Sequence, residues 1–326
     1  MNIAVLRALQ LGDLLCAVPA FRALRAAFPA AGITLVGLAW ASSFAARFGR
    51  YIDELVEFPG FPGTPQFFQR MRRRRFDLVL QMHGDGTRTN TIAARMGGRR
   101  TGGFYRGWNH CPDPATFVEW DERENEVVRC LRLAAKVGAP ARGTELEFPL
   151  SEADWAEWRA LGLSNYVCLH AGSQLPSRRW PPQRFAAIGD ALAKRGWTVA
   201  LTGSAGEAGI TAAVARAMRA PALDLAGKTS LGGLGALIAR ARLVVCNDTS
   251  VSHVAAALRT PSVVVCCGAD PQRWAPLDRE LHRVLYHEVP CRPCLYTECP
   301  IGHPCALGVS SGAVLDEVSG MLACAA

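Results

Sequence analysis

NYVCLHAGSQLPSRRWPPQRF, residues 165–185, has the pattern of a buried strand, a turn of small residues and the start of a helix. Four similar stretches follow, each ending in a small or polar residue where the chain must turn: WTVALTG (197–203), ALDLAG (222–227), RLVVCND (242–248) and SVVVCCG (262–268). Alternation of such strands with helix-like segments is typical of a parallel sheet covered on both faces. The second half of the chain is therefore predicted to be a doubly wound α/β domain.

The first half of the chain repeats this pattern. NIAVLRA (2–8) is a short apolar run followed by the turn LGD and a helical pattern, and ITLVGLAW (33–40) and FDLVLQMH (76–83) have the same strand character. A second α/β domain of the same architecture is predicted here.

The connection between the two domains is predicted in GAPARGTELEFPL, residues 138–150, which is rich in Gly and Pro and lacks sustained helical periodicity. Ser151 and Asp154 follow with the spacing of a helix capping box. Because 326 residues exceed what one core usually organises, we expect two Rossmann-like domains, residues 1–150 and 151–326.

Composition excludes several classes of protein. Half of the residues are hydrophobic, yet no apolar run approaches the ~20 residues of a membrane span, and charged residues come too early for a secretory signal. We therefore expect a cytoplasmic protein, in which most of the twelve cysteines are reduced core residues.

The net charge of +8 favours an anionic partner. The densest basic run, Arg70 and Arg72–Arg75, is interpreted as a solvated helix end or as a contact with the acceptor or a membrane surface. No nucleic-acid motif accompanies it, so nucleic acid is not an expected partner.

Candidate binding residues follow the strands of the second domain, because ligands of open α/β sheets bind beyond the carboxyl ends of the strands. Small residues there let a phosphate approach backbone N–H groups at helix N-termini. Such turns also need small residues for purely structural reasons, but four convergent ones favour a phosphate site. These turns are His170–Ser173, Thr202–Ser204, Asn247–Ser250 and Gly268.

Two arginines, Arg178 and Arg179, lie in the loop after the first of these strands. An arginine fork suits a diphosphate, although either residue alone is also explained as part of a solvated loop. There is no GxxxxGK[ST] and no GxGxxG after the first strand, which disfavours a P-loop nucleotidase and an NAD-dependent dehydrogenase.

The segment NDTSVSHVAAAL, residues 247–258, places Asp248, Thr249 and His253 around the start of a helix. Asp248 is either a site residue or a plain N-cap, and His253 is either a site residue or a packed core histidine.

The chain resembles the bacterial heptosyltransferases of glycosyltransferase family 9, which include the ADP-heptose:lipopolysaccharide heptosyltransferases. The resemblance covers nearly the whole length. It rests on LGDLLCAVPAFRALRAAFP, FDLVLQMHG, HAGSQLPSRRWPPQRF, DLAGKTSLGGLGALIARARLVVCNDTSVSHVAAAL, CGADPQRWAPLD and CRPCLYTECPIGHPC.

This resemblance implies the GT-B fold, an N-terminal acceptor domain, a C-terminal donor domain and inverting chemistry that needs no metal or other cofactor. It implies that Asp13, in the LGD turn, is the catalytic base, whereas the residue by itself, after a strand, favours a helix N-cap. Arg178 stands where the family usually has lysine, and Ser250 replaces the glycine of the family's DTG turn. The donor-binding residues implied by motif and position are Gly172, Ser173, Arg178, Arg179, Glu207, Thr229, Asp248, Thr249, Ser250 and His253.

Four cysteines near the C-terminus, with His303 nearby, resemble a structural metal site: Cys291, Cys294, Cys299 and Cys305. Their spacing fits no zinc finger cleanly, so structural zinc or iron, reduced loop thiols and a disulfide all remain open.

The expected activity is transfer of heptose from ADP-heptose to an anionic sugar of the lipopolysaccharide inner core, at the inner face of the inner membrane. Transfer to another acceptor, such as a protein or small molecule, and nucleotide-sugar binding without turnover are the alternatives. Acceptor, exact sugar and nucleobase, and oligomeric state are not set by the sequence.

Overall fold

A computed structural model describes residues 1–323 of the chain. The residues divide into two compact units, Met1–Pro149 and Leu150–Ala326, called here the N-terminal and C-terminal units. Between the helix that ends at Lys136 and the helix that begins at Glu152, the chain forms no helix or strand.

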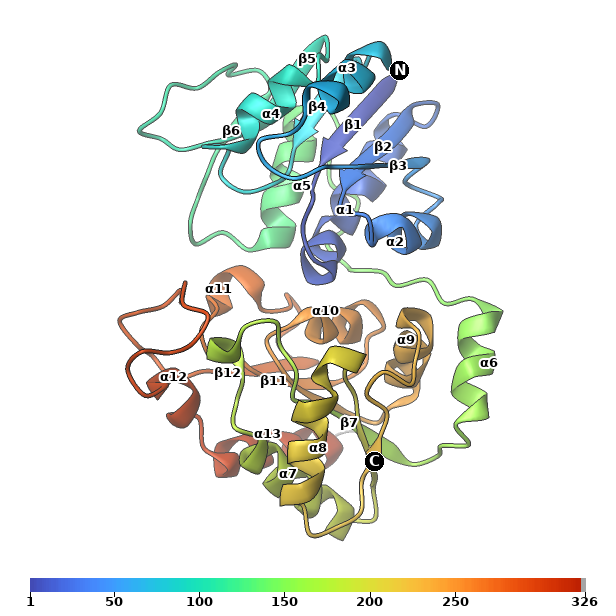
Figure 1. The fold of residues 1–326 in the computed structure, drawn as a ribbon, viewed down its shortest axis with the longest axis vertical. Helices are drawn as coiled ribbons and strands as arrows, with labels where there is room; N and C mark the ends of the chain where they lie inside the picture. The colour runs from blue at the N-terminus through green and yellow to red at the C-terminus, as the bar shows by residue number, and fades with distance from the viewer. Residues whose placement is uncertain (324–326) are drawn as a thin grey trace. The chain divides into compact units, whose positions relative to one another are not determined.

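The N-terminal unit is a parallel six-stranded sheet with helices around it, in the order β3-β2-β1-β4-β5-β6 (Figure 1). Its central strands are almost fully buried, as expected for a sheet covered on both faces. The strands are β1 (Asn2–Leu6), β2 (Gly32–Gly37), β3 (Glu54–Glu57), β4 (Leu78–Gln81), β5 (Arg100–Tyr105) and β6 (Phe117–Glu119). The helices are α1 (Leu11–Ala27), α2 (Ala41–Arg47), α3 (Pro65–Arg73), α4 (Thr89–Arg95) and α5 (Glu126–Lys136).

The C-terminal unit has a second parallel six-stranded sheet, in the order β12-β11-β10-β7-β8-β9. The strands are β7 (Tyr166–His170), β8 (Thr198–Leu201), β9 (Leu223–Asp224), β10 (Val244–Asn247), β11 (Ser262–Val265) and β12 (His282–Leu285). The helical segments are α6 (Glu152–Ala160), η1 (Pro176–Arg178), α7 (Pro182–Lys194), η2 (Ala205–Glu207), α8 (Ala208–Ala217), α9 (Leu231–Arg240), α10 (Ser250–Ala257), α11 (Pro271–Trp274), α12 (Pro304–Leu307) and α13 (Ser311–Ala323). The prediction of two Rossmann-like α/β sheets is confirmed.

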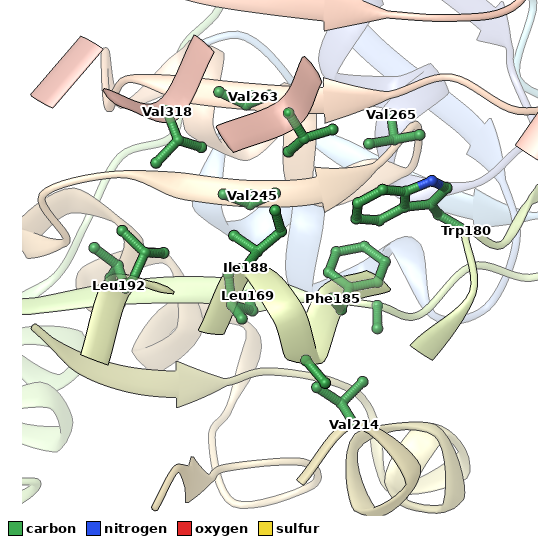
Figure 2. Close-up of a cluster of buried hydrophobic side chains, with 14 of the residues drawn as sticks. Leu169, Trp180, Phe185, Ile188, Leu192, Val214, Val245, Val263, Val265 and Val318 are labelled. Atoms are coloured by element: carbon green, nitrogen blue, oxygen red, sulfur yellow. The ribbon is translucent and has the colours of Figure 1, made fainter. Parts of the chain in front are cut away.

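The core of the C-terminal unit reaches directly under the loop that carries the two predicted arginines. Trp180 is fully buried, its ring lies 5.1 Å from that of Phe185, and its Nε1 donates to the carbonyl of Val309 at 3.0 Å. Figure 2 shows both rings among buried side chains of the central strands, such as Leu169, Val245 and Val265, and of the helices packed on them. Because this tryptophan follows the loop immediately, the core holds one end of the loop in place.

Helix α6 begins as predicted. The Ser151 hydroxyl accepts the backbone N–H of Asp154, and the Asp154 carboxylate accepts the N–H of Ser151 at 2.8 Å. This reciprocal capping box satisfies two N–H groups that a helix start would otherwise leave unpaired.

Candidate functional site

Asp13 lies just beyond the carboxyl end of β1, in the first turn of α1. The interpretation of Asp13 as the N-cap is wrong, because Gln10 occupies that position and Asp13 is the third helical residue. Its carboxylate accepts the backbone N–H of Gln10 at 3.2 Å. A negative charge in the first turn is also favoured by the helix dipole. The capping contact therefore fixes the carboxylate at this edge of the sheet.

Beneath this turn lies Arg7, a buried residue that the sequence did not mark as functional. Its Nε donates to the carbonyl of Asp13 at 2.8 Å, and its guanidinium pairs with Glu126 of α5 at 3.0 Å. Burial disfavours the charged guanidinium, but the negative potential of its neighbours, Glu126 and Asp13 among them, outweighs it and raises the pKa of Arg7. Glu126 also pairs with Arg129. The turn that carries Asp13 is thus anchored by a buried ionic network.

The basic run lies at the opposite edge of this sheet from Asp13, because it precedes β4 whereas Asp13 follows β1, and the two strands are parallel. Arg74 pairs with Glu54 at 2.5 Å, and Arg72 donates to the carbonyl of Arg95. Basic residues at the end of α3 also suit its dipole. The interpretation as a helix end fits this geometry, and a contact of these arginines with the acceptor or a membrane surface stays a prediction.

In the C-terminal unit, the predicted donor residues follow four parallel strands and so share one edge of the sheet. Gly172, Ser173 and the arginines follow β7, Glu207 follows β8, Thr229 follows β9, and Asp248–His253 follow β10. β7 and β10 are neighbours in the sheet although far apart in sequence, which marks the point where the strand order reverses. Ligands of doubly wound folds bind at such a point.

Glu207 is held directly against Gly172. Its Oε2 accepts from both the N–H and the hydroxyl of Ser204 at 2.8 Å. A Cβ at Gly172 would lie 2.1 Å from Oε1 of Glu207, so a larger residue here would have to displace the Glu207 carboxylate. Buried His170 is the last residue of β7, two positions before Gly172. Burial lowers the pKa of His170, and the Glu207 charge acts in the opposite direction.

Thr229 is half-buried on the segment between β9 and α9. The N–H of Gly227 donates to the carbonyl of Gly203 at 2.9 Å. Gly227 has φ of +68° and packs against Ala205 of η2. This contact places the segment of Thr229 beside the loop that carries Glu207.

Asn247 joins the loop after β7 to the end of β10, and this role was not predicted. Its Oδ1 accepts the N–H of Trp180 at 2.9 Å, and its Nδ2 donates to the carbonyl of Ala171 at 2.8 Å. The signal for it in the sequence is a polar residue that ends an apolar strand. Fully buried, Asn247 connects both ends of the loop of residues 171–180.

The two arginines of this loop have different roles. Arg179 holds the loop itself, because its Nε donates to the carbonyl of Ser173 at 2.8 Å and its guanidinium also reaches the carbonyl of Gln174. Arg178, in η1, makes no ion pair or hydrogen bond through its side chain within the described residues, and its buried Nε has no partner there. Arg178 is therefore the arginine available to an anion.

Helix α10 begins at Ser250, and its N-cap is Thr249, so the interpretation of Asp248 as the N-cap is wrong. Ser250, which stands where the family has glycine, does not have a positive φ. His253 is buried, and its ring lies 6.3 Å from that of Trp274. This burial fits the interpretation of His253 as a packed histidine.

The structure does not support the predicted metal at the cysteine cluster. Within residues 1–323, no three His, Cys, Asp or Glu side chains are arranged to hold a metal ion, and the four predicted cysteines are free thiols and form no disulfide. The four cysteines are close in sequence but differ in exposure: Cys291 is exposed, whereas Cys294 and Cys305 are buried.

Instead, the cysteine segment holds the loop of Arg178. Ser177 donates its N–H to the carbonyl of Thr297 at 2.9 Å and its hydroxyl to the carbonyl of Tyr296 at 2.6 Å. Its own carbonyl accepts from Nε2 of His303 at 2.8 Å. All three polar groups of one loop residue are therefore bound by the segment of residues 296–303.

No helix among residues 1–323 combines the length and the apolar character needed to cross a membrane.

Comparison with known proteins places these features in a family. Residues 65–304 match glycosyltransferase family 9 (heptosyltransferase). Lipopolysaccharide heptosyltransferase 2 of Escherichia coli (strain K12) is 26% identical over 322 residues, covering 89% of this chain and 90% of that protein.

Two solved structures share the fold, with two Rossmann-like domains of the GT-B type. The E. coli ADP-heptose lipopolysaccharide heptosyltransferase II has a TM-score of 0.78 at 22% identity, over 99% of this chain and 98% of that one. The E. coli heptosyltransferase WaaC with ADP has a TM-score of 0.72 at 17% identity, over 98% and 100%. Both the sequence match and the two-sheet architecture lead to one conclusion: the chain belongs to glycosyltransferase family 9, the heptosyltransferase family of lipopolysaccharide core biosynthesis.

Proposed function

We propose that the protein transfers heptose from ADP-heptose to an anionic sugar of the lipopolysaccharide inner core, with inversion at the anomeric carbon. Family membership supports the sugar, and the names of the solved relatives connect ADP-heptose and ADP with this fold. The N-terminal unit would bind the acceptor and the C-terminal unit the donor. We further propose that the protein works at the cytoplasmic face of the inner membrane as a peripheral protein, without a nucleic-acid partner.

The observation that carries the donor assignment is Arg178. A guanidinium whose buried Nε lacks a partner is costly unless a ligand supplies one, and a diphosphate offers the matching acceptors. The loop around it is held by the buried Trp180 and by Asn247, so the group is positioned before the donor binds. The first turn of α10, with Thr249 and Ser250, supplies further N–H groups toward an anion.

The remaining predicted residues surround this diphosphate site. Glu207, fixed against Gly172, would accept hydrogen bonds from ribose or sugar hydroxyls, and Ser173 and Thr229 lie on the neighbouring loops. Asp248 and His253 would contribute from β10 and α10. Arg179 keeps the shape of the loop and does not itself need to contact the phosphates.

Asp13 is the proposed general base. The acceptor oxygen forms its bond to the anomeric carbon from the face opposite the diphosphate, while the bond from that carbon to the diphosphate oxygen breaks. The acceptor hydroxyl proton passes to the Asp13 carboxylate, and ADP leaves with the bonding electron pair. The charge that develops on the leaving diphosphate would be stabilised by Arg178 and the start of α10, so we propose that the chemical step needs no metal.

The alternative of a nucleotide-sugar binding protein without turnover has one observation in its favour. Asp13 has a structural role of its own, because its carboxylate caps the N-terminus of α1. This capping role would account for an aspartate at position 13 even in a protein that never takes a proton from a substrate.

A mass-spectrometric screen tests the proposed function. Purified protein is incubated with ADP-heptose, and in parallel with UDP- and GDP-sugars, in the presence of lipopolysaccharide from a heptose-deficient bacterium. We expect an acceptor mass increased by one heptose with the ADP donor only. Binding of ADP-heptose without any transferred mass would favour the binding protein, and transfer from another nucleotide sugar would refute the donor assignment.

A further inference from the structure

An exposed aromatic ring stands on the Asp13 edge of the N-terminal unit and takes no part in the site described so far. Phe61 is 48% exposed, and its ring lies 5.4 Å from that of His83, which follows β4. Phe61 itself follows β3, which β2 and β1 separate from β4 in the sheet. The connection from β3 to α3 must therefore cross the carboxyl ends of two strands, β1 among them, to bring this ring to His83.

The loop of Phe61 is supported from below. The Phe61 ring lies 5.3 Å from that of buried Phe58, which in turn packs on Phe67 of α3. The N–H of Gly63 donates to the carbonyl of Gly60 at 2.7 Å, and a Cβ at Gly63 would lie 2.7 Å from the Phe68 ring. An apolar ring is thus presented to solvent by a packed aromatic base.

His83 offers a hydrogen-bond donor next to this ring. Its Nδ1 can only accept the backbone N–H of Ala8, at 3.1 Å, so the proton of the neutral ring lies on Nε2. Burial, with a further contribution from the Arg7 charge, lowers the pKa of His83 to about 4, so the ring stays neutral at physiological pH. Within the described residues Nε2 has no hydrogen-bond partner, which leaves its N–H open to a ligand.

His83 is tied to the turn of the proposed base. Ala8 binds His83 through its N–H, and the preceding residue, Arg7, donates to the carbonyls of Asp13 and Met82. The same two residues therefore hold Asp13 and His83 at one edge of one unit. A sugar hydroxyl bound next to Asp13 would therefore lie at the same sheet edge as this aromatic and imidazole pair.

We propose that Phe61 and His83 form the subsite for the acceptor sugar, an inference that rests on the proposed function and deepens it. The C–H face of a pyranose would pack on the Phe61 ring, and Nε2–H of His83 would donate to a ring substituent oxygen, a hydroxyl or a carboxylate. This subsite selects a pyranose with an apolar face and an oxygen acceptor on its edge.

Two substitutions at His83 separate its two nitrogens. His83→Asn keeps an oxygen near Nδ1 for the Ala8 N–H and removes the distal donor, whereas His83→Gln places an amide N–H near Nε2. Phe61→Leu keeps apolar bulk and removes the aromatic face. Tyr286→Leu, which alters a comparably exposed ring of the C-terminal unit, is the matched control.

The probe is O-deacylated lipopolysaccharide from a heptose-deficient bacterium, with ADP-heptose as donor. We expect His83→Asn and Phe61→Leu each to raise the acceptor KM and the directly titrated acceptor Kd about three- to tenfold, the effect of one lost hydrogen bond or packing contact. The donor Kd, the kcat and the shape of the pH profile should not change. His83→Gln should recover part of the loss, and Tyr286→Leu should behave as the wild type.

Unchanged acceptor KM and Kd in both variants, in an enzyme that turns over, would overturn the subsite and leave the proposed function intact. Imidazole ¹⁵N shifts that place the His83 proton on Nδ1 would also overturn it. If the wild type binds the probe without transferring heptose, the proposed function fails. The subsite is still supported in that case if His83→Asn weakens binding, and overturned if it does not.

Discussion

Replacing Asp13 by Asn separates its two roles, because the side chain can still cap α1 but can no longer take a proton. The Oδ1 of Asn can accept the N–H of Gln10 in place of the carboxylate. What the helix loses is the favourable charge in its first turn, worth about 0.3 to 1 kcal/mol. For a unit of this size that corresponds to a fall in Tm of roughly 1 to 4 °C.

The catalytic loss should be far larger. A general base contributes about 10²- to 10⁴-fold, and its effect is confined to the step in which the acceptor proton leaves. We therefore expect kcat to fall by that factor, with the Kd for ADP-heptose unchanged. The measurement is ADP release at saturating donor and acceptor, with the donor Kd from calorimetry and Tm from differential scanning.

Asp154 provides the control, since it occupies the same third position of a capping box in α6. Asp154→Asn should cost a similar amount of stability and leave kcat as in the wild type. Near-normal turnover in Asp13→Asn would refute the assignment of Asp13 as the base. Equal losses of kcat in the two variants would show that the loss of a capping carboxylate, and not proton transfer, explains the effect.

Three further predictions follow from the structure. Arg178→Ala should weaken ADP binding by about 10- to 100-fold without changing Tm. Arg179→Ala should mainly lower Tm, because only Arg179 holds loop carbonyls. Calorimetry that finds the larger loss of ADP affinity in Arg179→Ala would refute this division of roles. Turnover should survive EDTA, and a complete loss that magnesium or manganese restores in a folded protein would contradict the metal-free step. Burial lowers the pKa of His282 to about 4, below the ~6.5 of an unfolded chain, so the unfolded state binds more protons between these values. The stability that neutral His282 contributes is then complete above about pH 6.5 and lost as the pH falls toward 4, by roughly 2 to 4 kcal/mol in all. In urea unfolding from pH 7.5 to 4.5, the free energy of unfolding should decline less steeply in His282→Asn than in the wild type. An identical decline in both proteins would contradict this prediction.

The sequence alone was sufficient for the class of fold and for the sheet edges at which the proposed site residues lie. Apolar strands, turns of small residues and helical periodicity are local patterns, so they remain readable without a structure. Because parallel strands carry their loops at one edge, the residues that end those strands were also predictable, including Gly172, Thr249 and Asp13. The capping box at Ser151 was predictable for the same reason, since both partners lie within four residues.

Only the tertiary structure decided what individual side chains do within these loops. Arg178 and Arg179 are chemically identical neighbours, and they differ because the fold turns one toward the carbonyl of Ser173 and leaves the Nε of the other without a partner. The cysteine segment resembled a metal site in sequence, yet in the fold its residues hold Ser177 by hydrogen bonds.

The partners that hold the site together are the least predictable part. Arg7 meets Glu126 across 119 positions of sequence, and Asn247 reaches Trp180 across 67. Phe61 reaches His83 only because its loop crosses the ends of intervening strands. Sequence patterns report the period of a strand or helix and the residues that end it, whereas a contact between distant residues depends on strand order and loop path. These are set by packing of the whole unit, so the positions of the site residues came from the sequence and their partners from the fold.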